Sequence, residues 1–245
     1  MISHLGSCAF TLVLIPAVAC QVEGEPATSG PSLAAKAQAA QARMHARFES
    51  ARRIELAIVH SDLDKARVEA HFLGRLDEPD MLPQWRPYLD RIWAAARRIE
   101  LAPDVVEAAK ATAVLGRECG RCHQALAAKI AFPVEARPAD DRRLQQQMLG
   151  HQWASARMWD GLIGASDDSW VTGSRALTQV SLTIVAEEPM TITLRDSGGH
   201  IGDDIARVRL YANRALTAKD QDARAEIFGD LLATCARCHA TIRDR

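Results

Sequence analysis

The chain has 245 residues, enough for two domains of about one hundred residues each and an N-terminal extension. Hydrophobic residues make up 48% of it but aromatic residues only 5%, a balance that favours packed helices over sheets. The formal net charge is −1 and neither half has a concentrated basic face, so the composition argues against a partner that is a nucleic acid.

The N-terminus is predicted to be an export signal. Residues 10–19 form an apolar run too short to cross a bilayer as a helix, and residues 1–20 together are interpreted as a signal peptide. The small residues before Cys20 suit ordinary cleavage, and they also resemble a bacterial lipobox that would leave Cys20 acylated. Both outcomes stay open. Residues 21–35 are polar and rich in Gly, Pro and Ser, which predicts a flexible linker.

Residues 36–131 are predicted to form a four-helix bundle. An apolar stripe runs along the first helix, and Ser61 or Asp62 is expected to cap the second. Pro103-Asp104 is expected to open the fourth helix. The expected helices cover residues 34–59, 62–73, 87–101 and 104 onwards through the first of two cysteine motifs.

Two copies of a C-x-x-C-H motif carry the strongest functional signal. They are Cys119-Gly-Arg-Cys122-His123 and Cys235-Ala-Arg-Cys238-His239. On a helix, positions i, i+3 and i+4 share one face, so both sulfurs can form thioethers to one edge of a porphyrin while the imidazole becomes an axial ligand of the iron. The motifs therefore predict two covalently bound haem c groups, each held by two cysteines and one histidine.

Three other interpretations of the motifs are weaker. Chance is improbable because there are two copies, both on predicted helices. Disulfides suit an exported protein, but they do not explain the histidine after each cysteine pair. A zinc site formed by all four cysteines would require two helix ends far apart in sequence to converge.

The second half of the chain, residues 140–245, repeats the pattern of the first. A shift of 104 positions places Met44 on Met148, and near the end of each half a shift of 116 places one motif on the other. The difference of 12 residues falls between the second and third helices of the second half. Two alternating, β-branched segments within residues 180–194 predict a short hairpin there.

A four-helix unit with C-x-x-C-H on its last helix resembles the class II c-type cytochromes, the cytochrome c-prime group, here in a tandem dihaem form. Class I cytochromes carry the motif near the N-terminus, the reverse of the order in this chain. The resemblance implies an all-α fold of two tandem four-helix bundles. It also implies that His123 and His239 are the proximal iron ligands, and that the first helix of each half faces the other side of its haem.

The sixth iron ligands are expected on these first helices. Met44 and Met148 are the leading candidates, because a thioether opposite histidine raises the reduction potential and closes the site. Core packing explains a methionine on a helical stripe equally well. His151, three residues after Met148 on the same face, is the main rival, and His45 is a second. Weaker candidates lie in the insertion, at Met190 and His200.

One-electron transfer is the function that these features predict, with other redox proteins as donor and acceptor. The expected location is the periplasm, either as a soluble protein or through a lipid anchor at Cys20, and a homodimer is an open alternative. The chain is expected to be an electron carrier and not an enzyme. Binding of NO or CO at a five-coordinate haem is the alternative, and a dihaem peroxidase a third hypothesis. A structural lipoprotein without haem completes the set.

Overall fold

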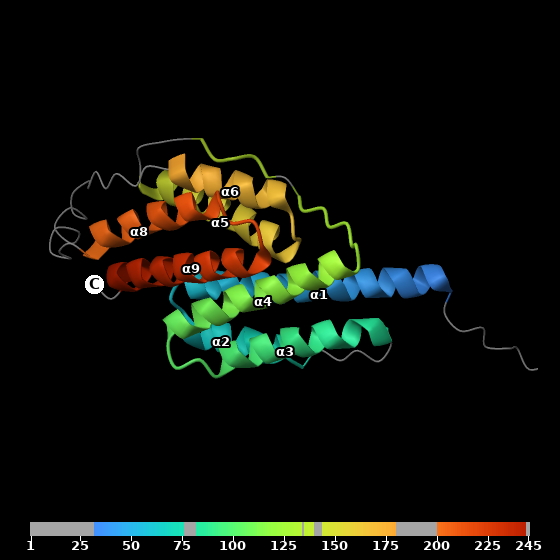
Figure 1. Ribbon diagram of the computed structural model, residues 1–245. Coiled ribbons are helices and arrows are strands. Elements are labelled where there is room, and N and C mark those ends of the chain that lie inside the picture. Colours follow the sequence, from blue (N-terminus) through green and yellow to red (C-terminus); the bar gives the residue numbers. More distant parts are fainter. Residues whose placement is uncertain (1–31, 76–81, 134, 140–143, 180–199, 244–245) are drawn as a thin grey trace, which may run out of the picture. The chain divides into compact units, whose positions relative to one another are not determined.

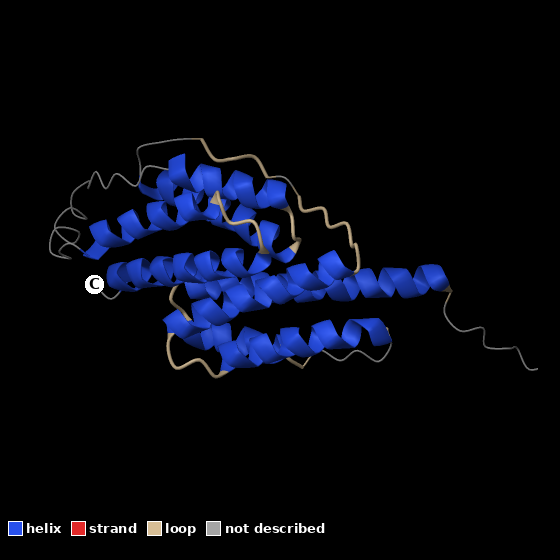
Figure 2. Ribbon diagram, viewed as in Figure 1, coloured by secondary structure: helices blue, strands red, loops and turns tan. Residues whose placement is uncertain are grey.

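The computed structural model describes residues 32–75, 82–133, 135–139, 144–179 and 200–243. In this part of the chain all regular structure is helical, which confirms the predicted all-α class (Figures 1 and 2). The elements are α1 (Leu33–Val59), α2 (Leu63–Leu73), a 3-10 turn η1 (Pro83–Trp85), α3 (Arg86–Glu100), α4 (Val105–Ala125), α5 (Leu144–Ile163), α6 (Asp167–Gln179), α8 (His200–Ala215) and α9 (Gln221–Arg243).

Side-chain caps fix where two helices of the first half begin. The carboxylate of Asp62 accepts a hydrogen bond from the backbone N–H of Lys65 at 3.0 Å, so Asp62 and not Ser61 caps α2. Asp104 caps α4 in the same way, accepting from the backbone N–H of Glu107 at 2.9 Å. Each bond satisfies a backbone donor that has no partner within its helix. Both helix starts therefore lie where the sequence predicts them.

The chain divides into two compact units after Gln41, inside α1. In the first unit, the Ser32 hydroxyl accepts a hydrogen bond from the backbone N–H of Ala35 at 3.2 Å and caps the start of α1. The second unit, Ala42–Arg245, contains the hydrophobic core and both cysteine motifs.

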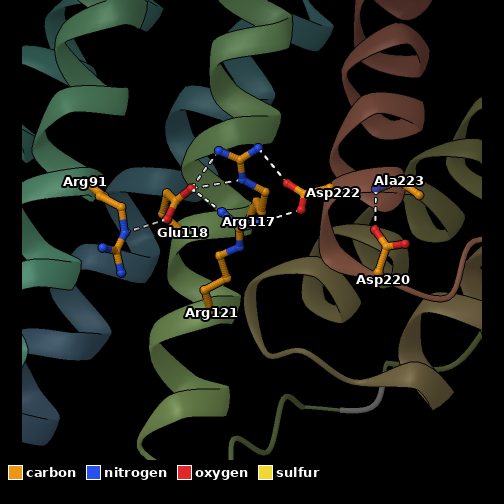
Figure 3. A network of polar contacts seen from close by, with 7 residues as sticks. All are labelled: Arg91, Arg117, Glu118, Arg121, Asp220, Asp222 and Ala223. Atoms are coloured by element: carbon orange, nitrogen blue, oxygen red, sulfur yellow. Dashed lines mark hydrogen bonds and ion pairs between the residues drawn. The ribbon is translucent and has the colours of Figure 1, made fainter.

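The two motif helices, α4 and α9, pack against each other in antiparallel directions. Near the middle, a Cβ added to Gly229 would lie 3.4 Å from the Cβ of Ala113, so small residues let the helices approach closely. Further along α4, the guanidinium groups of Arg117 and Arg121 reach Asp222 at the start of α9, at 2.9 and 2.6 Å (Figure 3). Residue numbers increase along α4 in the direction in which they decrease along α9. The motif end of each helix therefore lies beside the beginning of the other.

Helices α1 and α5, the first of each half, meet each other and the motif helices. The Glu55 carboxylate of α1 lies near the Ser155 side chain of α5. Helix α5 packs against both α4 and α9, and the Trp159 ring stacks on Phe228 of α9 with ring centroids 5.5 Å apart. Helices α2 and α3 pack along α4, while α8 packs along α9 and α6 packs against α5 and α8.

Buried residues from both halves form one connected hydrophobic cluster. Each large apolar side chain removed from water contributes about 1.5–3 kcal/mol to folding before the loss of chain entropy is counted. The largest fully buried side chains are those of Trp159, Trp170, Phe228, Ile54, Ile58, Leu73, Leu89, Ile99, Leu115, Met158, Leu162 and Leu231. The division into separate bundles at 36–131 and 140–245 stays a prediction about folding units.

Three predicted features lie outside the described residues: the signal peptide 1–20, most of the linker 21–35, and the hairpin within 180–194. Among the helices that the structure describes, none combines the length and the apolar character needed to cross a membrane.

Candidate functional site

Each C-x-x-C-H motif lies in the last turns of a long helix, α4 or α9. Neither motif contains proline, and the helix continues through it, so the two cysteines and the histidine share one face as their spacing predicts. All six side chains are partly buried. The four motif cysteines are free thiols in the structure.

The two motif histidines make the same contact. The Nδ1 atom of His123 lies 2.8 Å from the backbone carbonyl oxygen of Ile163, and the Nδ1 atom of His239 lies 2.6 Å from that of Val59. A carbonyl oxygen only accepts hydrogen bonds, so Nδ1 carries the hydrogen and Nε2 keeps its lone pair. Burial is the main cause that lowers the pKa of both histidines, and both imidazoles are therefore neutral at pH 7.

These contacts join opposite halves of the chain. His123 ends the first half but bonds the last residue of α5, and His239 ends the second half but bonds the last residue of α1. Ile163 follows Val59 by 104 positions and His239 follows His123 by 116, the two shifts that relate the halves in sequence. The contacts are thus a symmetry-related pair, and each motif histidine is oriented by the other half.

The thiols are shielded to different degrees within each motif. Burial raises the pKa of Cys119 and of Cys235, the first cysteine of each motif, to about 12. Burial also raises the pKa of Cys122 and Cys238, which are less enclosed. All four sulfurs are consequently protonated thiols at neutral pH in the folded chain without cofactor.

The two motifs lie at opposite ends of the antiparallel helix pair. His123 is ten residues beyond Ala113 and His239 is ten residues beyond Gly229, the residues at which α4 and α9 cross. At 1.5 Å per residue, the histidines are separated along the pair by about 30 Å. In the part of the chain that the structure describes, no three His, Cys, Asp or Glu side chains gather as a metal site. A zinc site joining all four cysteines is therefore wrong.

The predicted sixth ligands lie on α1 and α5. Met44 is half-buried, and Arg47 one turn later approaches its sulfur, with Nη1 3.9 Å from Sδ. Arg47 is itself buried and lies close to Cys119 and Cys122 of the first motif. Met148 on α5 is half-buried.

The histidines named as alternative ligands differ in exposure. His45 is exposed on α1. His151 on α5 is largely buried, and its Nε2 atom has no hydrogen-bond partner among the described residues. His200 begins α8, with a side chain that is not described, and Met190 lies outside the described residues.

Sequence reasoning missed the carbonyl oxygens of Val59 and Ile163, because backbone acceptors have no residue-type signature. It gave no role to Arg47, although the 104-position shift pairs this residue with His151. It also gave none to His60, whose ring stacks on that of His239 with centroids 5.8 Å apart.

The residues present suit a covalently attached haem at each motif. Two free thiols and a neutral imidazole with an available Nε2 share each helix face. At the second motif, the buried Nε2 atom of His151 has no hydrogen-bond partner among the described residues and could bind a metal. Comparison with protein families, curated proteins and solved structures finds no match to this chain.

Proposed function

We propose that this protein is a one-electron carrier with two covalently attached haem c groups, one at each C-x-x-C-H motif. The observation that carries the proposal is the pair of Nδ1-to-carbonyl contacts, at His123 and at His239. A histidine that must bind iron through Nε2 needs its other nitrogen tied to an acceptor, and both motif histidines meet this requirement. A buried imidazole N–H needs an acceptor in any role, so the indication of ligation is this contact together with two free thiols on the same helix face.

The four motif cysteines would hold the two groups. Cys119 and Cys122 would form thioether bonds to one group and Cys235 and Cys238 to the other, and because the thiol hydrogen would be kept on the vinyl carbon, no oxidant would be needed. When bound, each group supplies an iron that changes between the ferrous and ferric states. His123 and His239 would each bind an iron through Nε2, and Met44 and Met148 are the predicted sixth ligands.

The chain's own residues keep the sites dry and rigid. Helix α5 orients His123 and helix α1 orients His239. The facing residues come from the other first helix, as with Arg47 of α1 at the first motif. Enclosure in low-polarity surroundings limits solvent rearrangement and tunes the reduction potential. No substrate pocket is required, since the substrate is an electron. Partners are other redox proteins in the periplasm, and Cys20 decides whether a lipid holds the protein at a membrane.

A redox titration followed by optical spectroscopy tests the proposal. The carrier is expected to show two reversible one-electron steps and low-spin spectra in both states, and the reduced spectrum is expected to stay unchanged under CO. A high-spin component that binds CO would instead favour the alternative function, gas binding at a five-coordinate iron. Steady consumption of hydrogen peroxide with a reduced donor would favour a dihaem peroxidase.

A further inference from the structure

The two cofactor sites differ at one pair of equivalent positions. The shift of 104 that places Met44 on Met148 also places Arg47 on His151, one turn further along the same helices. Both side chains are largely enclosed, and both lie near a cysteine motif. The contrast between them is chemical, because a guanidinium has no lone pair to offer a metal and a neutral imidazole has one.

Arg47 marks the first motif. Its side chain is 7% exposed, lies beside Cys119 and Cys122, and places Nη1 3.9 Å from the sulfur of Met44. A guanidinium stays protonated in proteins and cannot bind iron, so at this motif the half-buried sulfur of Met44 is favoured over the exposed imidazole of His45.

His151 marks the second motif. Helix α5 packs against α9, and His151 lies close to Arg209 of α8 and to His239. Burial first, and then these two neighbours, lower the pKa of His151 to about 4, so the imidazole is neutral. Its Nε2 atom is buried without a hydrogen-bond partner among the described residues, an arrangement that native structures rarely leave unexplained.

We propose that His151, in place of Met148, is the sixth ligand of the second iron, while Met44 ligates the first. This inference rests on the proposed function and refines it. Binding to iron would give the buried Nε2 atom of His151 the partner that it lacks in the protein. The thioether of Met148 would then not be needed at that site.

Unequal ligands give the two centres unequal potentials. Methionine opposite histidine raises the potential of a haem iron, and the first centre also has the buried positive charge of Arg47 nearby, which favours the ferrous form. The second centre, with two imidazoles, is the low-potential one. At equilibrium an electron that enters the protein therefore resides on the first centre.

Ligand identity is tested on the full haem-loaded chain by electron paramagnetic resonance and by the near-infrared methionine-to-iron band. The wild type is expected to give one bis-histidine low-spin signal and one methionine band per two haems. His151→Leu is expected to remove the bis-histidine signal, whereas Met148→Leu leaves it and Met44→Leu removes the methionine band instead. The mass of each denatured variant is measured first. Two retained haem masses show that both haems are attached, as the proposed function requires.

Two methionine bands in the wild type would overturn the inference without recourse to any variant. So would a His151→Leu protein that keeps both wild-type spectra. If the His151→Leu chain does not fold, the wild-type spectra alone decide. A chain from a haem-maturing host with no covalent haem would instead end the proposed function itself.

Discussion

The imidazole Nδ1 of His239, near the end of the chain, lies 2.6 Å from the carbonyl oxygen of Val59, 180 positions earlier. His123 repeats this contact with Ile163. Because each contact joins the end of one half to the first helix of the other, neither motif histidine is oriented by its own half alone. The two halves of the chain therefore depend on each other for the orientation of their motif histidines.

Close packing of α4 on α5 should make Gly120 sensitive to a single methyl group. An added Cβ at Gly120 would clash with the carbonyl oxygen of Leu162, next to the acceptor of His123. We expect Gly120→Ala to lower the free energy of unfolding by about 1–3 kcal/mol, since the helices must separate. Urea denaturation of the haem-loaded protein, followed by circular dichroism, measures this.

Gly202 in α8 provides the matched control, since nothing lies within 4 Å of an added Cβ there. Gly202→Ala is expected to be stabilising by about 0.5–1 kcal/mol through helix propensity. Equal effects of the two substitutions would contradict the close approach of α4 and α5.

The network around Glu118 links α3, α4 and α9 (Figure 3). The buried Glu118 carboxylate accepts from Arg91, Arg117 and Arg121 at 2.7–3.3 Å, and two of these arginines also reach Asp222. Removing the buried carboxylate leaves three guanidinium groups facing one another. Glu118→Gln is therefore expected to lower the free energy of unfolding by about 2–3 kcal/mol, less than for a fully buried pair because water reaches the arginines.

Asp222 tests whether burial sets the size of that effect. Its side chain is 61% exposed, so Asp222→Asn is expected to change the unfolding free energy by less than about 1 kcal/mol. If thermal and urea unfolding rank the two variants in the opposite order, the buried carboxylate is not the centre of the network.

Stability should fall as the pH rises from about 4.5 to about 7 because of Glu55. Burial raises the pKa of Glu55 to about 7, against the opposing effects of Arg52 and of the nearby Ser155 side chain. The folded chain therefore holds a proton that the unfolded chain has already released, and the stability present below the unfolded pKa is lost through this window. The loss is of the order of 3 kcal/mol.

Glu55→Gln mimics the protonated acid and should remove most of this dependence. We expect the variant to match the wild type at pH 4.5 and to be more stable at pH 8, as urea midpoints at the two pH values would show. An unchanged difference between pH 4.5 and pH 8 in the variant would assign the dependence to other groups, among them Asp160, whose pKa burial raises to about 6.

The different burial of the four motif thiols predicts the order of their reaction rates. Since thiolate is the reactive form, Cys119 and Cys235 should react with iodoacetamide more slowly than Cys122 and Cys238 in folded, haem-free protein. Peptide mass spectrometry after timed alkylation at pH 8 measures the four rates, and guanidinium chloride should equalise them. Faster reaction at the first cysteine of each motif would refute the burial pattern.

Local signals explain how much of the fold was predictable. Asp104 after a proline marks the start of α4, and the i, i+3, i+4 spacing of Cys119, Cys122 and His123 places them on one helix face. Both features depend only on neighbouring residues. The all-α class follows in the same way from the stripes of apolar side chains.

The features that could not be predicted depend on contacts between residues far apart in the sequence. The acceptor of His239 is the backbone of Val59, and no side chain records that it lies there. Met148 and His151 are rival candidates in the sequence because both lie on one face of α5, and only packing shows that His151 has a buried, unpartnered nitrogen. Helix pairing between the halves is likewise set by the whole core.

The decisive measurement is the mass of the denatured chain after expression with a c-type maturation system. Two haem masses are expected to stay covalently bound to the wild-type chain. One is expected on a Cys119→Ser, Cys122→Ser chain and one on a Cys235→Ser, Cys238→Ser chain. A wild-type chain without any haem mass after denaturation would show that neither motif attaches haem.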